Sequence, residues 1–252
     1  MSHPRILKIV QLYPREMNIY GDRGNAQVLA RRGELYGFAT EIASFEIGGD
    51  AKILRGADII LGGGGQDSGQ NLIAKDLQKN GGELRDLAQS GVAMLMICGL
   101  YQLFGKFFRA NNGEKMAGIG VFDAETVAGE RRLIGNIVIA ADFGKIVGYE
   151  NHSGLTTLGE NQAAFGRVAK GAGNNDRDKT EGARRFNAFG SYLHGPILPK
   201  NPQFADELLR LAVARKFGDE KLAPRDENAK TELEKLDNLA KAARAIAIKR
   251  PQ

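Results

Sequence analysis

The chain has 252 residues, 42% of them hydrophobic and 26% charged, a composition that indicates a soluble globular protein able to bury a core of its own. A single cysteine excludes an intrachain disulfide, and with only three histidines it also excludes the usual cysteine-rich zinc site. Residues 221–252 hold eight basic and five acidic side chains, hence +3 of the formal net charge of +5. The rest of the chain therefore lacks the basic surface of a nucleic-acid-binding protein.

The first half of the chain alternates predicted strands with predicted helices. Residues 6–12 are apolar and β-branched, as in a buried strand, and residues 24–36 form a helix that Gly37 ends. Further strands are predicted over 40–45, 57–61 and 92–97, and helical stretches over 71–78 and 82–89, broken by Asn80-Gly81. This order predicts an α/β fold, a doubly wound and mostly parallel sheet with helices on both faces. Ligand sites in such sheets lie beyond the carboxyl ends of the strands.

After Gly105 the pattern changes to short segments of strand character. These segments are 118–126, 133–140, 145–149 and 186–193, and we expect them to add antiparallel strands to the same sheet. Asn201 then stands where a helix N-cap is expected, because Pro202 suits the first helical position and Gly218 suits the end of the helix. Residues 1–220 are thus predicted to form the main domain.

Residues 221–252 are predicted to form a C-terminal amphipathic helix. Its apolar face carries Leu233, Leu236, Leu239, Ala243 and Ile246. This face can pack on the chain's own body or dock on a partner, and the positive charge of the helix can meet an anionic membrane surface. No apolar run approaches the roughly 20 residues of a membrane-spanning helix, and the first residues lack a signal-peptide core, so we expect a cytoplasmic protein.

Cys98 directly follows the fourth predicted strand, and Gly99 follows Cys98. A sharp strand-to-helix turn at this point can lift a nucleophile out of the sheet and aim the following amides at it. The start of a helix also lowers a thiol pKa and so increases the thiolate fraction. The competing interpretation is a small buried hydrophobic residue, because free cysteines are often buried.

Two further features favour the chemical interpretation of Cys98. Residues 62–65 are four consecutive glycines after the third strand, and their amides can complete an oxyanion hole. This loop lacks both the Lys-Ser/Thr pair of a phosphate-binding loop and Rossmann spacing. His194 ends another apolar segment, and an imidazole beside a thiol can accept its proton and return one to the leaving group, as acyl transfer requires.

The order of these motifs resembles class I, triad-type glutamine amidotransferases of the cobyric-acid-synthase-like (CobB/CobQ-like) branch. It resembles more closely the GatD family, the glutaminase subunits of lipid II isoglutaminyl synthase. The resemblance covers nearly the whole chain. It includes Asn18-Ile19-Tyr20-Gly21-Asp22-Arg23-Gly24-Asn25, the glycine loop, Cys98-Gly99-Leu100-Tyr101-Gln102, Gly148-Tyr149-Glu150-Asn151-His152-Ser153-Gly154, Gly173-Asn174-Asn175-Asp176 and Tyr192-Leu193-His194-Gly195-Pro196.

The resemblance implies a role for each residue of the site. Cys98 attacks the side-chain amide of glutamine, ammonia leaves, and water releases glutamate from the thioester, with His194 as general base and acid. Gln102 and Arg132 hold the glutamine substrate. A guanidinium can pair bidentately with its carboxylate, and Arg131 is the neighbour that could be confused with Arg132.

We expect the amides of Gly64 and Gly99 to bind the tetrahedral oxyanion. The chain departs from the family pattern at Leu100, where relatives often have a second glycine, which leaves open which amide after the cysteine is the better donor. His152, in a predicted loop, is expected to form structural hydrogen bonds, and the Asn174-Asn175-Asp176 segment to form a turn.

The second departure is Pro196, which stands where triad enzymes usually have a glutamate two residues after the histidine. We expect an acidic residue of the ligase subunit to orient His194, so that the isolated chain hydrolyses glutamine poorly.

The resemblance also implies the partner. This is a MurT-like subunit related to Mur ligases, which forms a heterodimer with the chain and uses ATP and magnesium to amidate the D-glutamate of lipid II in peptidoglycan synthesis. The chain itself is expected to bind no metal or cofactor, and to reach membrane-bound lipid II only through that partner. One alternative is a glutaminase for another ATP-dependent amidation, such as that of a cobyrinate-like corrin. Another is a non-catalytic interaction protein with the same fold.

Overall fold

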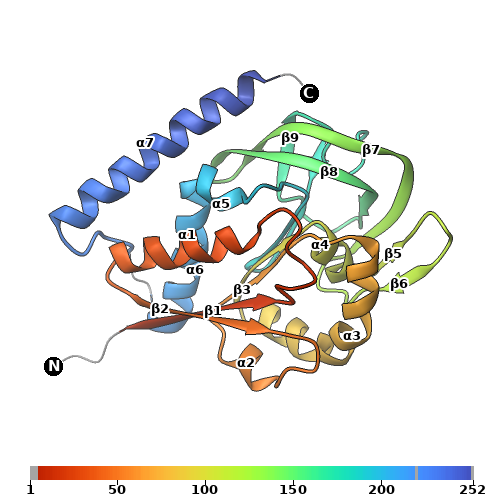
Figure 1. Ribbon diagram of the computed structural model, residues 1–252, viewed down its shortest axis with the longest axis horizontal. Helices are drawn as coiled ribbons and strands as arrows, with labels where there is room; N and C mark the ends of the chain where they lie inside the picture. Colours follow the sequence, from red (N-terminus) through yellow and green to blue (C-terminus); the bar gives the residue numbers. More distant parts are fainter. Residues whose placement is uncertain (1–4, 219–220, 251–252) are drawn as a thin grey trace.

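The computed structural model describes residues 5–218 and 221–250 and contains two β-sheets with helices packed around them (Figure 1). In chain order the elements are β1 (Ile6–Leu12), α1 (Arg23–Leu35), β2 (Ala39–Phe45), α2 (Lys52–Arg55), β3 (Ile59–Gly62), α3 (Asp67–Gln89), β4 (Ala93–Ile97), α4 (Gly99–Phe104), β5 (Phe107–Arg109), β6 (Lys115–Ala117), β7 (Ala124–Ala141), β8 (Gly144–Leu158), β9 (Gly166–Lys170), β10 (Thr180–Glu181), β11 (Ala183–Arg185), β12 (Ala188–Ser191), α5 (Ile197–Lys200), α6 (Pro202–Phe217) and α7 (Glu227–Lys249).

The first sheet confirms the predicted fold class. Its strand order is β11-β12-β4-β3-β1-β2, and all neighbours are parallel except the pair β11 and β12. Strands β3, β4 and β12 are buried along their whole length, which explains why they are continuous apolar runs and do not alternate. Helices α1 and α6 pack together, and so do α3 and α4, so the sheet is covered on both faces.

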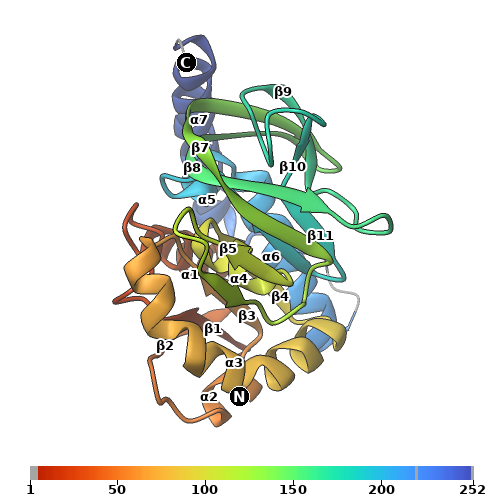
Figure 2. The ribbon, with the colours of Figure 1, turned by 90° about the vertical axis from the view of Figure 1, so that its right-hand side faces the viewer.

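The second sheet corrects the prediction for the later segments. Its order is β10-β9-β7-β5-β6, with β8 paired to β7, and it lies beside the first sheet as a separate layer (Figure 2). Residues 133–140 and 145–149 belong to the long strands β7 and β8, which pair with each other and not with the first sheet. Of the segments predicted as additions, only 186–193 joins the first sheet, through β12, which pairs with β4 in parallel and not in the predicted antiparallel direction.

The predicted strand over 118–126 is wrong for most of its length. Between β6 and β7 the chain hydrogen-bonds to the end of α4: the Ile119 amide donates to Leu103 O at 2.8 Å, and the Phe122 amide to Phe104 O at 2.9 Å. The backbone groups of this segment are thus satisfied by α4, and β7 begins only at Ala124.

Helix α3 is continuous, although a break was predicted at Asn80-Gly81. The Asn80 side chain donates to the backbone oxygen of Asp76, one turn earlier, and therefore stabilises the helical turn. A β-carbon on Gly81 would lie 2.9 Å from Ile119 Cγ2, so the glycine allows α3 to approach the chain after β6. Tertiary packing thus outweighs the weak helix propensity of this pair.

Asn201 precedes α6 as predicted, but its side chain does not cap that helix. It accepts a hydrogen bond from the Val147 amide at 2.9 Å and donates to Val147 O and Ile197 O, at 2.8 and 2.7 Å. Asn201 is fully buried, so these three bonds anchor β8 of the second sheet to the start of α6.

Aromatic packing joins the two layers. Phe165, just before β9, packs with Phe189 of β12 and Phe204 of α6, with ring centroids 5.5 and 4.9 Å apart. Phe143, at the turn between β7 and β8, stacks on Phe204 with a centroid distance of 5.1 Å. Buried rings in such tilted and edge-to-face arrangements contribute more than their buried area alone, so the two sheets share one core.

Helix α7 packs along the outside of α1 (Figure 1). Leu233 and Ala229 form a small buried cluster with Leu35 of α1, whereas Leu239 and Ile246 are 61% and 58% exposed. The boundary predicted between the main domain and the C-terminal helix, after residue 220, adjoins residues 219–220, which are outside the described residues. No helix in the described part of the chain combines the length and apolarity needed to cross a membrane.

Candidate active site

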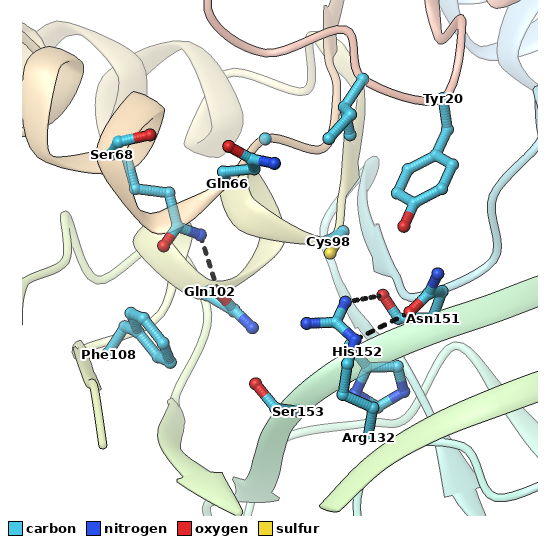
Figure 3. Close-up of a pocket in the computed structure, with 13 residues that line it drawn as sticks. Tyr20, Gln66, Ser68, Cys98, Gln102, Phe108, Arg132, Asn151, His152 and Ser153 are labelled. Carbon is cyan, nitrogen blue, oxygen red and sulfur yellow. Dashed lines mark hydrogen bonds between the residues drawn. The ribbon is translucent and has the colours of Figure 1, made fainter. Parts of the chain in front are cut away.

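A cavity of about 540 Å³ lies beside the carboxyl ends of the parallel strands. The loops that follow β1, β3 and β4 contribute Tyr20, Gly65 and Cys98 to it, and the second sheet contributes Arg132 and Asn151 from the opposite side (Figure 3). The remaining lining residues are Ile19, Gln66, Ser68, Gln70, Gln102, Phe108, His152 and Ser153. The site therefore lies at the sheet edge predicted for a doubly wound fold, but the second sheet completes it.

Cys98 stands at a strained turn between β4 and α4. Its φ and ψ angles are 49° and −104°, in a region that non-glycine residues rarely adopt, and the sulfur faces the cavity (Figure 3). The Cys98 amide donates to Ser191 O at 2.8 Å, and the Gln102 amide donates to Cys98 O at 2.9 Å, so both flanks of the turn are held. This is the predicted elbow geometry.

Gly99 is closely packed at this turn. A β-carbon at this position would lie 2.5 Å from Gln70 Nε2 and 2.7 Å from Met17 Cε, so these two side chains would have to shift to admit it. The small residue beside the nucleophile therefore lets α3 and the loop after β1 close over the turn. The predicted role of the Gly99 amide as an oxyanion donor stays a prediction.

His194 is fully buried and lies next to the glycine loop. A β-carbon on Gly64 would be 2.8 Å from His194 Cε1 and 3.2 Å from Cys98 Cβ, so both side chains border the same small volume above Gly64. The Tyr20 ring packs on the imidazole at a centroid distance of 4.2 Å. Backbone hydrogen bonds with Tyr149 of β8 hold the His194 main chain in place.

The imidazole of His194 is neutral and lacks an orienting group. Neither ring nitrogen has a hydrogen-bond partner among the residues that the structure describes. Burial lowers the pKa of His194 to about 3, and the positive charge of Arg132 acts in the same direction. The ring is therefore unprotonated at neutral pH and only weakly basic, because no carboxylate of the described chain stabilises its protonated form or fixes its tautomer.

The glycine loop is held by a residue that the sequence analysis did not assign to the site. The Gly64 amide donates to Asp22 Oδ2 at 2.8 Å, so in this conformation it is committed to Asp22 and is not available to an oxyanion. Gly65 lines the cavity, and its amide donates to no acceptor in the described part of the chain. In this conformation Gly65, and not Gly64, is therefore the candidate oxyanion donor of the glycine loop, beside Gly99.

Arg132 faces the cavity, and Arg131 does not. The Arg132 Nε and Nη2 atoms donate to the side-chain and backbone oxygens of Asn151, at 2.9 and 3.0 Å (Figure 3). Arg131 forms an ion pair with Asp176 at 2.6 Å, away from the cavity. Asn151 thus holds the Arg132 guanidinium in place, and the guanidinium can still donate hydrogen bonds to an anionic group in the cavity.

Gln102 belongs to a buried chain of hydrogen bonds. Its Oε1 accepts from Gln70 Nε2 at 2.7 Å, and its Nε2 donates to the hydroxyl of Tyr192 at 3.2 Å. The Tyr192 hydroxyl in turn lies 2.6 Å from Thr156 Oγ1. Gln102 therefore lines the cavity with a side chain that protein groups already hold, and its predicted contact with a substrate stays a prediction.

The relation of this chain to known proteins agrees with the geometry. Residues 8–202 match the model of the CobB/CobQ-like glutamine amidotransferase domain. The chain is a glutamine amidotransferase of this family. It is 40% identical over 212 residues to the lipid II isoglutaminyl synthase (glutamine-hydrolyzing) subunit GatD of Staphylococcus aureus, covering 83% of this chain and 86% of that protein.

The GatD subunit of Streptococcus pneumoniae is 37% identical over 224 residues, which cover 87% of this chain and 85% of that protein. Among solved structures, one described as a glutamine amidotransferase superposes with a TM-score of 0.57 at 18% identity, covering 81% of this chain and 98% of that structure. The structural likeness supports the amidotransferase fold, and the sequence similarity supports GatD membership.

In this amidotransferase His152 lies in β8 and not in the predicted loop. Its ring stacks on Tyr192 at a centroid distance of 3.6 Å, and its Nδ1 lies 2.8 Å from Gly154 O. Burial lowers the pKa of His152 to about 4, so the ring is neutral. These contacts fit the structural role expected for it, although the residue also borders the cavity.

The asparagine segment forms the turn that was predicted. Asn175 Oδ1 accepts from the amides of Arg177 and Asp178, and Asn174 hydrogen-bonds to Gly182 through both its donor and its acceptor. The sequence analysis did not assign Gln70 or Phe108 to the site, because neither lies in a recognised motif, nor Ser153, which does lie in one. Tyr20, Asp22 and Asn151 lie within recognised motifs, so for them a signal was available.

Proposed function

We propose that this amidotransferase is the glutaminase subunit of a lipid II isoglutaminyl synthase and supplies ammonia to a MurT-like ligase subunit. The observation that carries the proposal is the cavity in which Cys98, at its strained turn, faces Arg132 across a space of substrate size. The similarity to the two GatD subunits supports the choice of lipid II over a corrin as the final acceptor.

The reaction follows from the arrangement of the side chains. Arg132 binds the α-carboxylate of L-glutamine, and the Cys98 sulfur attacks the side-chain amide carbon while neutral His194 accepts the thiol proton. Amides of Gly99 and of the glycine loop stabilise the oxyanion of the tetrahedral intermediate. His194 then returns the proton to the leaving nitrogen, ammonia departs, and water attacks the thioester with His194 as base to release glutamate.

The unpartnered ring nitrogens of His194 support an orienting group from outside the chain. In triad enzymes a carboxylate holds the histidine in the correct tautomer. We propose that an acidic residue of the ligase subunit approaches His194, because Pro196 occupies the position of the usual glutamate. ATP and magnesium act on that subunit, where the D-glutamate carboxylate of lipid II is activated and amidated to D-isoglutamine.

The test is glutamine hydrolysis by the chain alone and after addition of the MurT-like subunit. We expect weak hydrolysis alone and at least a 10-fold increase in the complex, because tautomer control of the base in a triad is worth several orders of magnitude. Full activity of the isolated chain would contradict the external orienting group. A C98A variant in the complex is the control: unchanged amidation of lipid II with glutamine as nitrogen donor would contradict the catalytic role and favour a non-catalytic subunit.

A further inference from the structure

The segment Asn18–Asn25, which is the end of the loop after β1 and the first residues of α1, lies between the two catalytic loops, and the proposed function uses none of its polar groups. On one side the Ile19 amide donates to Gly64 O at 3.1 Å, and Asp22 accepts from the Gly64 amide. On the other side Asn25 Oδ1 accepts from the Leu198 amide at 3.0 Å, four residues after His194. The segment Asn18–Asn25 therefore contacts both the glycine loop and the segment that carries the histidine.

The close packing of the segment Asn18–Asn25 leaves little freedom to the glycines. A β-carbon on Gly63 would be 2.9 Å from both Asp22 Cβ and Oδ2, and one on Gly24 would be 2.6 Å from Pro196 Cγ. Glycine at these two positions permits these contacts. The segment Asn18–Asn25 thus packs on the glycine loop on one side and on the segment after His194 on the other. The Asp22 carboxylate is its buried polar contact with the glycine loop.

Burial of the Asp22 carboxylate costs free energy, because the charged group loses its contact with water. The residue is only 6% exposed, and among the described residues its carboxylate accepts a hydrogen bond only from the Gly64 amide, so that Oδ1 has no partner there. Burial raises the pKa of the Asp22 carboxyl to about 6, against the opposite effect of the Gly64 hydrogen bond. A buried carboxylate with one donor contributes little to stability, so its value lies in fixing the direction of that donor.

We propose that Asp22 is a positioning residue of the oxyanion hole. Its carboxylate holds the Gly64 amide away from the cavity and thereby turns the next peptide group, so that the Gly65 amide faces the substrate beside Cys98. This inference rests on the proposed glutaminase function, because it assigns the oxyanion donor of that reaction. It predicts that Asp22 acts on the chemical step and not on the binding of glutamine, which Arg132 performs.

The experiment compares D22A, D22N and D58A in the complex with the ligase subunit. Asp58 is the control, because it is also buried and accepts a backbone hydrogen bond, from Lys8 at 2.8 Å. Unlike Asp22 it also pairs with Lys216, at 2.7 Å, and it precedes β3 and so lies away from the carboxyl ends that border the cavity. We expect D22A to lower kcat for glutamine hydrolysis about 100-fold, the effect of losing one oxyanion donor, with KM changed less than about 3-fold. D22N keeps an oxygen that accepts the Gly64 amide and should retain most of the activity. D58A should leave kcat within about 2-fold, although it lowers stability.

Alkylation of Cys98 by iodoacetamide provides the second readout. This reaction needs an accessible thiol but no oxyanion hole, so its rate in D22A should match that of the wild type if the site remains folded. Equal kcat in D22A and D58A, a rise of KM without loss of kcat, or an equal loss of alkylation would each overturn the role of Asp22. A wild-type complex that does not hydrolyse glutamine would instead overturn the proposed function, and this assignment with it.

Discussion

Arg131 and Arg132 are neighbours with the same side chain, and the structure separates their environments. Alternation of side chains along a strand does not by itself separate the two arginines, because the pairing of β7 with β8 is irregular between Ala128 and Leu133. Arg132 lines the cavity and donates to Asn151, whereas Arg131 pairs with Asp176 and does not line it. The choice between the two arginines therefore depends on the local geometry of β7, which the sequence does not show.

This pair provides a matched test of substrate binding. We expect R132A to raise the KM for glutamine by about 10- to 100-fold, because a charge-assisted hydrogen bond is worth about 1.5–3 kcal/mol. R131A should change KM less than about 2-fold, since its side chain contacts only an exposed surface carboxylate. Steady-state hydrolysis by the complex measures both values. A comparable rise in R131A would show that the binding arginine has been assigned wrongly.

The two halves of helix α7 differ in how far their apolar side chains are buried. Its first half is attached to the body: Arg32, a buried residue of α1, pairs with Asp237 of α7 at 2.7 Å and with Asp206 of α6 at 2.6 Å. In its second half Ala240 is buried and Arg244 donates to Gln203 of α6 at 3.1 Å, but the apolar side chains of Leu239 and Ile246 are exposed. Self-packing thus accounts for part of the predicted apolar face along the whole helix, and docking of the exposed side chains on a partner stays a prediction.

Two leucines of α7 test this division. We expect L233A to lower the free energy of unfolding by about 2–3 kcal/mol, because Leu233 is buried against Leu35 and truncation of a buried leucine leaves a cavity. L239A should change it by less than about 0.5 kcal/mol, since Leu239 is 61% exposed. Urea unfolding measures both, and equal effects would contradict the division.

Deletion of the residues after Pro224, followed by measurement of complex formation, separates self-packing from docking. L239A is the milder form of this test, because it removes an exposed apolar side chain and should leave the fold intact. Loss of binding to the ligase subunit by L239A would assign the second half of α7 to the interface.

Glu181 links the two sheets of the molecule at a buried point. It belongs to β10 of the second sheet, and its Oε1 accepts the Tyr192 amide, just after β12 of the first sheet, at 2.7 Å. The Ser191 hydroxyl also donates to this carboxyl. Burial raises the pKa of Glu181 to about 8, so near neutral pH the folded protein holds a proton here that the unfolded chain releases.

The stability of the whole molecule should therefore fall as the pH rises from 7 to 8. Over this range the folded state binds more protons than the unfolded state, whose glutamate has its ordinary pKa near 4.5, so the free energy of unfolding decreases with pH. Integration over that interval gives a loss of about 1 kcal/mol. The neutral histidines contribute little here, because their ordinary pKa lies below this range.

An E181Q variant is the control for this pH dependence. Urea unfolding at pH 7.0, 7.5 and 8.0 should give a smaller decrease in the variant than in the wild type, by about 1 kcal/mol over the interval. Parallel curves would show that Glu181 is already ionised in the folded protein at neutral pH.

The sequence by itself determined the first sheet and the order of the chemical groups. Strands β1, β3 and β4 are short apolar runs ended by polar or glycine-rich loops, and that local pattern is enough to predict a buried parallel strand. The turn at Cys98 was likewise readable, because an apolar strand, a cysteine and Gly99 stand next to one another. Local signals of this kind do not depend on distant residues.

Tertiary structure decided what the second half of the chain does and how the site is held. The apolar alternation of β7 and β8 does not reveal which sheet they join, because that choice depends on packing around Phe165, Phe189 and Phe204. The direction of the Gly64 amide depends on Asp22, 42 residues earlier in the chain. A glycine loop has many accessible conformations, and only contacts of this kind, made after folding, select the one that faces the substrate.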